Sequence, residues 1–250
     1  MLTNTAGVAV KLYKVLAVGR KSCHGGRMVW EPFHWYEISG DLIPCQNGFH
    51  LCRPEDLLDW LQEEIWKGQV QRGWVYGDGK IVAEKARITW QCLGWNNRTA
   101  RLFAADCVQN VAHLCTLRSV QRYIETTRRF AEGAVSYDDL LAARDAAWVV
   151  DKAKDTPSWV AAMESNYVAK EAIWNRSRNT FQTTAMNAAR AAAMEMAQKE
   201  SWAAAKKASW YAALAEALAQ DKGDATKAAF QAARQTQTRQ LMQYLAGEYE

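Results

Sequence analysis

Residues 201–214 read SWAAAKKASWYAAL, and this setting of tryptophans among alanines decides the fold of the second half of the chain. Alanine has the highest intrinsic helix propensity, because it loses no side-chain entropy when a helix forms. Trp202 and Trp210 lie about two turns apart, and Leu214 and Leu218 continue the same face. The stretch therefore predicts a helix that packs through this stripe in an antiparallel bundle.

Three helices are predicted between residue 136 and the C-terminus. Their boundaries carry residues that cap helices, or a proline in the first turn. The boundary signals are Ser136–Asp139, Thr156-Pro157 and Gly223-Asp224, and the predicted helices span 137–153, 157–221 and 225–246. The middle helix is too long for an ordinary globular protein, so we expect a break near Arg178–Thr184 or near Lys199–Ser201.

The first 94 residues have a different composition, since eleven of the fourteen glycines fall there among β-branched and aromatic runs. Such runs between turn residues are typical of short strands. We expect strands at 12–18, 35–38, 49–52, 65–70 and 80–90, a short helix from Arg53 to Leu61, and a turn at Gly77-Asp78-Gly79. Two further helices, one capped by Asn96–Thr99 and reaching Leu114 and one over 118–131, lead into the bundle. The fold class is therefore α+β, with a small antiparallel-sheet domain at 1–94 and an all-α domain at 95–250.

Charge and composition exclude several classes of function. The formal net charge is only +4 and the signs are interspersed, so we do not expect a nucleic-acid-binding protein. No stretch approaches the length of a membrane span, and the N-terminus lacks the features of a signal peptide. The six cysteines, all in the first half, are expected to be reduced thiols of a cytoplasmic protein.

The densest basic cluster is Arg118, Arg122, Arg128 and Arg129. It fits either a solvated helix face or a nucleic-acid or phosphate site. Large aromatic side chains and arginines are common anchors in protein interfaces. Candidate partner-binding residues are Arg118, Arg122, Trp174, Trp202 and Trp210, although the tryptophan stripe fits the core of a bundle equally well.

A second candidate site lies in the first domain. The loop Gly19–Gly26 is basic and flanked by glycines, so its backbone amides could hold a phosphate, although it lacks the Walker spacing. Trp30, Trp35 or Tyr36 could then stack on a base. The candidate ligand-binding residues are Arg20, Lys21, His24, Trp35, Tyr36 and His50.

Metal binding and nucleophilic catalysis have weaker sequence support. Cys23, Cys45, His50 and Cys52 are zinc-type ligands, and His50 and Cys52 would share one face of a strand. No Cys-x-x-Cys pair is present, so we expect buried thiols and no cofactor, with structural zinc as the alternative. Cys23 adjoins His24, but neighbours in a strand point to opposite faces and no third orienting group is evident. The sequence therefore favours a protein that is not an enzyme.

Three segments carry resemblances to known families. VLAVGRKSCHGG (15–26) and NGFHLCRPEDLL (47–58) resemble a family of uncharacterised phage-encoded proteins. Gly48–Leu51 resembles small relatives of ADP-ribosyltransferases, which would give His50, Tyr36 and Glu84 or Glu64 roles in NAD chemistry. RTARLFAADCV (98–108), RRFAEG (128–133) and AARDAAW (142–148) resemble helical immunity proteins of bacterial toxin systems. The last resemblance implies a protein that binds and occludes another protein, although those proteins lack the N-terminal domain found here.

Three functions follow from these observations. The first is a non-enzymatic, phage-type interaction protein of the host cytoplasm, which binds and blocks a host defence or toxin-related protein through its helical domain. The second is a nucleotide-binding or ADP-ribosyltransferase-like module, acting as a sponge for a signalling nucleotide or as an NAD-dependent transferase. The third is a structural or virion-associated homo-oligomer assembled through the alanine-rich helices.

Overall fold

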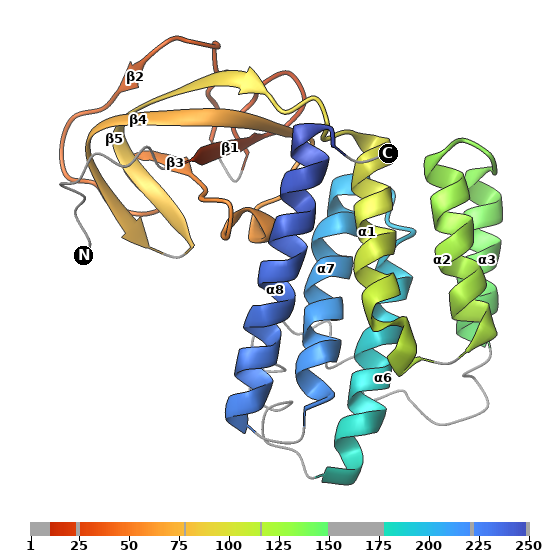
Figure 1. The fold of residues 1–250 in the computed structure, drawn as a ribbon. Coiled ribbons are helices and arrows are strands. Elements are labelled where there is room, and N and C mark those ends of the chain that lie inside the picture. The colour runs from red at the N-terminus through yellow and green to blue at the C-terminus, as the bar shows by residue number, and fades with distance from the viewer. Residues whose placement is uncertain are drawn as a thin grey trace. The chain divides into compact units, whose positions relative to one another are not determined.

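The computed structural model describes residues 11–23, 26–77, 79–115, 117–149, 178–220 and 223–248. The fold is α+β, with an antiparallel sheet in the N-terminal part of the chain and helices in the remainder, as the sequence predicts (Figure 1). Among the helices within these ranges, none is both long enough and apolar enough to cross a membrane.

Five strands of the described residues form one sheet in the order β1-β4-β5-β2, with β3 also pairing with β5. A long hairpin is its centre, and β4 continues seven residues past the predicted end at Val70. The pairing of β4 with β5 changes register at two places, one of them between Gln71 and Trp74, and continues beyond each of them. A change of register of this kind bends a strand without ending its hydrogen-bonded ladder. The strands are β1 (Leu12–Leu16), β2 (Tyr36–Glu37), β3 (Phe49–Leu51), β4 (Glu64–Gly77) and β5 (Lys80–Gln91).

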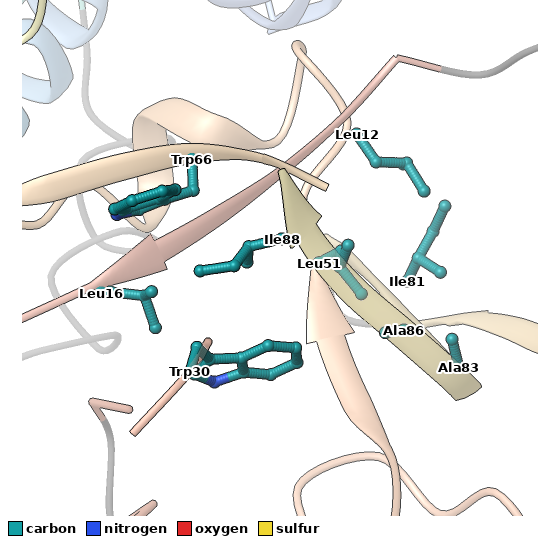
Figure 2. Packing of buried hydrophobic residues seen from close by; sticks show 9 residues of the cluster. All are labelled: Leu12, Leu16, Trp30, Leu51, Trp66, Ile81, Ala83, Ala86 and Ile88. Carbon is teal, nitrogen blue, oxygen red and sulfur yellow. The ribbon is translucent and has the colours of Figure 1, made fainter. Parts of the chain in front are cut away.

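Large side chains form the core of the sheet (Figure 2). Trp30 is only 1% exposed and contacts the rings of Tyr36 and Phe49 edge-on, with centroid distances of 5.1 and 5.4 Å. Burial of this much apolar surface is the main favourable term in folding. The cluster consists of Leu12, Leu16, Trp30, Leu51, Trp66, Ile81, Ala83, Ala86 and Ile88.

The helix predicted from Arg53 to Leu61 is wrong in length, since only a single 3-10 turn, η1 (Leu57–Asp59), forms there. Asp56 occupies the N-cap position but its side chain makes no capping hydrogen bond. Its carboxylate instead accepts hydrogen bonds from Arg53 and Tyr76, so the amides of the first turn are left without that cap.

The signal at Ser136 marks the start of α3, whereas α8 begins at Gly223 itself, so Asp224 lies in its first turn and not at the predicted N-cap position. The Ser136 hydroxyl accepts the Asp139 amide at 3.1 Å, and the Asp139 carboxylate accepts the Ser136 amide at 2.9 Å, which confirms that capping box. The long middle helix breaks between Glu195 and Ser201, the second of the two predicted places. Thr156-Pro157 lies outside the described residues. The elements are α1 (Asn97–Val111), η2 (Ala112–Leu114), α2 (Arg118–Ala131), α3 (Tyr137–Val149), α6 (Arg178–Glu195), α7 (Ser201–Leu218) and α8 (Gly223–Ala246).

Backbone contacts group the chain into two compact units. The first unit comprises residues 1–100, 200–206 and 238–250, and the second comprises 101–199 and 207–237. These units are defined by contacts and do not test which segments fold independently, so the domain boundary expected after residue 94 stays a prediction.

Gly94 marks a close approach within the first unit. A Cβ atom placed on Gly94 would collide with the carbonyl oxygen of Tyr244, near the end of α8, and would lie 3.0 Å from the Gly247 nitrogen. Both neighbours are backbone atoms, so they cannot move aside as a flexible side chain could. Only glycine fits at this position.

Alanines form most of the core of the second unit, where Ala188, Ala192 and Ala193 of α6 are fully buried. Arg101 of α1 is buried beside the C-terminal end of α6. Its guanidinium donates to the carbonyl oxygens of Met196, Gln198 and Lys199 at 3.0, 2.9 and 2.8 Å. These carbonyls lie at and just beyond the end of α6, where intrahelical partners run out and a positive charge is favoured.

Candidate functional site

Helix α2 has one buried face and one polar face. Val120, Tyr123, Ile124 and Thr127 are buried. The opposite face carries charged and amide side chains, which are exposed at Arg118, Gln121, Arg122 and Glu125. This division follows from the three- and four-residue spacing of the apolar positions.

An open pocket lies along this polar face, with a volume of about 510 Å³. It unites Arg118 and Arg122, both predicted as partner-binding residues, with Arg128 of the same basic cluster. We call it the α2 arginine surface. Its lining residues are Gln109, Arg118, Gln121, Arg122, Ile124, Glu125 and Arg128.

The arginines of this surface are in different electrostatic states. Arg128 forms an ion pair with the buried carboxylate of Asp106 in α1, so its charge is largely neutralised and its position is fixed. Arg118 and Arg122 are exposed, and neither forms an ion pair with any residue that the structure describes. Glu125 is the one acidic residue among those that line the pocket. The surface therefore presents an excess of positive charge held on a rigid helix.

Trp202 and Trp210, two of the tryptophans predicted to bind a partner, are not among the residues that line this surface. Trp210 is half-buried and packs against Tyr211 and Phe230, with centroid distances of 5.5 and 6.0 Å. Trp202 is also half-buried, and Trp174 lies outside the described residues. The contacts of Trp210 are those of a side chain that packs between helices.

The glycine-flanked loop binds a carboxylate of its own chain. The Gly19 amide donates to Glu64 Oε1 at 2.7 Å, and the Arg20 amide donates to Glu64 Oε2 at 3.3 Å. Both residues have positive φ angles, which turn neighbouring amides toward one acceptor. These two amides are therefore already occupied by an anion. Lys21 is exposed and forms backbone bridges to Ala17 and Val29.

The other predicted ligand-binding residues are separated by the sheet. The Tyr36 ring packs near Phe49, whereas His50 is the next residue of β3, and neighbours in a strand point to opposite faces. Trp35 is half-buried under the guanidinium of Arg87, 4.6 Å from its ring. Trp30 lies in the core and His24 lies outside the described residues. Tyr36 and His50 therefore cannot serve one ligand from the same face.

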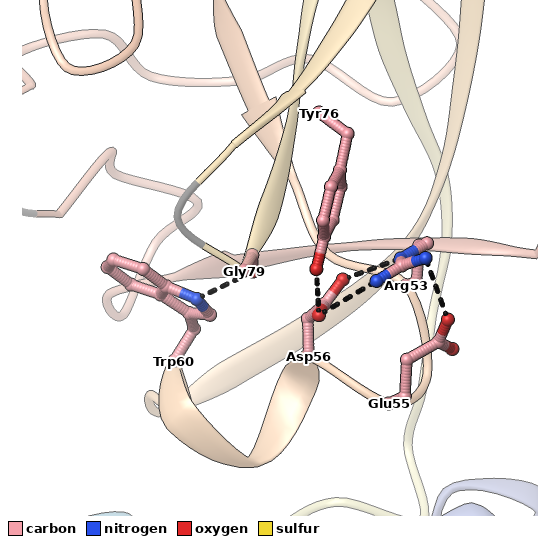
Figure 3. Close-up of polar contacts among 6 residues, drawn as sticks. All are labelled: Arg53, Glu55, Asp56, Trp60, Tyr76 and Gly79. Atoms are coloured by element: carbon pink, nitrogen blue, oxygen red, sulfur yellow. Dashed lines mark hydrogen bonds and ion pairs between the residues drawn. The ribbon is translucent and has the colours of Figure 1, made fainter. Parts of the chain in front are cut away.

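A polar network joins η1 to the end of the β4–β5 hairpin (Figure 3). Asp56 accepts hydrogen bonds from Arg53 Nε at 2.8 Å and from the Tyr76 hydroxyl at 2.8 Å. The Arg53 guanidinium stacks 3.9 Å from the Tyr76 ring centroid, and the Trp60 indole donates to the Gly79 carbonyl at 3.0 Å. The hydrogen bond and charge of Asp56 raise the pKa of Arg53. These groups are mutually satisfied, which is typical of a structural fastening rather than of a catalytic site.

A histidine, a cysteine and a lysine meet beside this network. The Cys45 amide donates to His50 Nε2 at 3.0 Å, and Lys80 Nζ donates to Cys45 Sγ at 3.2 Å. Burial lowers the pKa of His50 to about 4, with further lowering by the charges of Lys14 and Lys80. A neutral imidazole is required for Nε2 to accept a hydrogen bond, so the shift agrees with the geometry.

The candidate zinc ligands are not assembled into a site. No three histidine, cysteine, aspartate or glutamate side chains gather in metal-binding geometry within the part of the chain that the structure describes. His50 Nε2 is engaged by the Cys45 amide. Burial raises the pKa of the Cys52 thiol to about 12 and also raises that of Cys23.

Several residues of these clusters were not predicted as site residues. The three-residue spacing of Arg53 and Asp56 was a local signal for their ion pair, but the pairing of Cys45 with Lys80 depends on the sheet register. Comparisons with protein-family models, with curated protein sequences and with solved structures gave no match to this chain. The functional argument therefore rests on the geometry of the molecule.

Proposed function

We propose that this is a non-enzymatic interaction protein, which binds an acidic segment of another protein at the α2 arginine surface and thereby blocks that protein. The proposal rests on one observation: Arg118 and Arg122 lie one turn apart on α2, and both line the same open pocket. In the context of the sequence resemblances, the proposed partner is a host defence or toxin-related protein.

The chemistry of the lining residues supports binding to carboxylates. A guanidinium offers a planar fork of donors that matches a carboxylate, and it keeps its proton at any physiological pH. Gln109 and Gln121 add neutral donors and acceptors around the two charges. The surface offers hydrogen bonds and charge but no nucleophile, so it suits recognition better than catalysis.

The arrangement on a helix supports specificity. Arg118 and Arg122 are one turn apart, and Arg128 is held in place by its ion pair with Asp106. The helix therefore fixes the backbone positions of the two arginines before binding, which reduces part of the entropy lost on association. Charges of this kind also accelerate encounter with an oppositely charged partner.

The test compares three forms of the full chain in affinity capture from a bacterial lysate. These are the wild type, the double variant Arg118→Glu with Arg122→Glu, and a control with Arg98→Glu and Lys227→Glu. The control reverses two exposed charges outside the α2 arginine surface, so it has the same net charge as the Arg118/Arg122 variant. Circular dichroism checks that all three forms are equally folded. We expect one stoichiometric protein with the wild type and the control, and an affinity for it that is lower by about 100-fold or more in the Arg118/Arg122 variant.

Two results would contradict the proposal. One is capture that survives charge reversal at Arg118 and Arg122, because the partner would then bind elsewhere. The other is a chain that elutes without a partner as a defined oligomer in light scattering, which would favour the structural alternative. A captured protein that is released by moderate salt and loses binding when its own acidic segment is neutralised would identify the occupant of the surface.

A further inference from the structure

Cys45 differs from the other cysteines of the chain in its exposure. The remaining five are buried or half-buried, whereas the Cys45 side chain reaches solvent. Burial raises the pKa of Cys52, Cys92, Cys107 and Cys115, which keeps those thiols protonated and unreactive. Oxidants dissolved in water therefore meet Cys45 first.

Cys45 and Lys80 are held in a fixed geometry. Lys80 is buried, and its ammonium lies 4.4 Å from the ring centroid of Trp60 and 3.2 Å from Cys45 Sγ. The Cys45 backbone is also held, since its amide donates a hydrogen bond to His50 Nε2 and its φ angle is 64°. The sulfur is thus accessible from solvent on one side and in contact with a primary amine on the other.

We infer that Cys45 and Lys80 form a covalent crosslink when the protein meets a peroxide. In the first step the peroxide transfers one oxygen atom to the thiol, giving a sulfenic acid and one water; sulfur loses two electrons and the O–O bond accepts them. Lys80 then releases a proton to solvent, and the lone pair of its amine attacks sulfur. The S–O bond breaks, and the departing hydroxide leaves as a second water with a proton from nitrogen. The product is an S–N bond, and a thiol reductant restores both side chains.

The crosslink would fasten an irregular segment to the sheet. Cys45 belongs to the turn closed by the bridge between Ile43 and Asn47, and Lys80 is the first residue of β5. A bond between positions 45 and 80 closes a loop of 35 residues (80 − 45). Closing a loop of this length restricts the unfolded chain, so oxidation is expected to raise the thermal midpoint by several degrees.

The experiment treats the reduced full chain with dilute hydrogen peroxide and measures intact mass, peptide masses and thermal midpoint. The variants are Cys45→Ser, Lys80→Arg and, as a control away from the pair, Cys23→Ser. We expect the wild type and the Cys23 variant to lose two hydrogens, to yield one joined peptide containing Cys45 and Lys80, and to regain the starting mass in dithiothreitol. A joined peptide that retains one oxygen, after a second equivalent of peroxide, supports the same pairing.

The inference is overturned if Cys45 is recovered as a sulfinic or sulfonic acid while Lys80 is unmodified, since the amine would then not trap the sulfenic acid. It is also overturned if Cys45 does not react, or if Lys80→Arg forms the same joined peptide. The wild-type measurement alone distinguishes these outcomes, so a folding defect in a variant would not leave the question open. None of them depends on the α2 arginine surface.

Discussion

The core of the sheet and the buried face of α6 in the second unit are built from side chains of opposite size. The sheet encloses Trp30, Trp66 and several leucines and isoleucines, whereas α6 contributes mainly alanines. A large side chain removes much apolar surface from water in one place, while alanines remove little each and instead allow close helix contacts. The two regions should therefore fail under opposite changes, the sheet when a side chain is shortened and the helices when one is lengthened.

Polar fastening also differs between the two regions. In the second unit single side chains reach from one helix to the backbone of another, as Arg101 does at the end of α6 and as Gln237 does with the Ser209 carbonyl at 2.8 Å. In the sheet the backbone ladder itself fixes the register. An alanine core offers few distinct shapes, so these directional bonds define the alignment of its helices.

The largest effect is expected at the centre of the sheet. Trp30→Ala should lower the free energy of unfolding by about 3–5 kcal/mol, because it removes a fully buried ring and leaves a cavity. Chemical denaturation followed by circular dichroism measures this. Trp90→Ala provides the control, since Trp90 is 65% exposed and should cost less than about 1 kcal/mol. Equal losses in the two variants would remove the distinction between core and surface on which the comparison depends.

The next effect tests the fastening of the helices. Arg101→Ala should cost about 3 kcal/mol, because three carbonyl groups at the end of α6 lose a charged donor in a buried place. Arg101→Lys keeps the charge but lacks the fork, and we expect an intermediate loss in the same denaturation measurement. If the lysine variant were as stable as the wild type, charge alone would explain the role of Arg101.

A smaller effect is expected from lengthening a side chain in the alanine core. Ala192→Leu should cost about 1–3 kcal/mol, because Ala192 is fully buried and added methylenes force its neighbours apart. Ala232→Leu on the exposed side of α8 makes the same chemical change and should be close to neutral. A stabilised Ala192 variant would show that this core contains unfilled space.

The smallest effect is a dependence on pH that is confined to the sheet. The pKa of His50 is lowered to about 4 in the folded protein, so the unfolded chain binds the proton more readily as pH falls below about 6.5. The stabilisation from neutral His50 is fully present above pH 6.5 and is lost on the way down to pH 4. Allowing for solvent screening, the change is on the order of 1 kcal/mol. Thermal midpoints of His50→Gln, with His113→Gln as the exposed control, should show a flatter pH profile only for the first variant.

The sequence predicted the elements better than the contacts among them. Alanine runs, capping residues and glycine turns act locally, so the helices, the strands and the break before Ser201 were recoverable from them. The same is true of Arg118 and Arg122 on α2, because residues four apart share a helix face, whereas the place of Arg128 also involves its ion pair with Asp106 of α1. The extension of β4, the shortening of η1 and the pairing of Cys45 with Lys80 depend on register and on competing hydrogen bonds between distant segments. The hydrogen bond from the Gly19 amide to the Glu64 carboxylate also joins distant segments, and no local sequence pattern predicts it.

The close approach at Gly94 has a consequence for how the protein is made. The atom that a side chain at Gly94 would strike belongs to Tyr244, which is synthesised 150 residues later (244 − 94). The first unit likewise takes in residues 200–206 and 238–250. On a ribosome that adds about 5–20 residues per second, the strands emerge many seconds before the segment that completes their unit. Because this late segment belongs to the first unit, truncations that remove it are expected to destabilise the part of the chain made first.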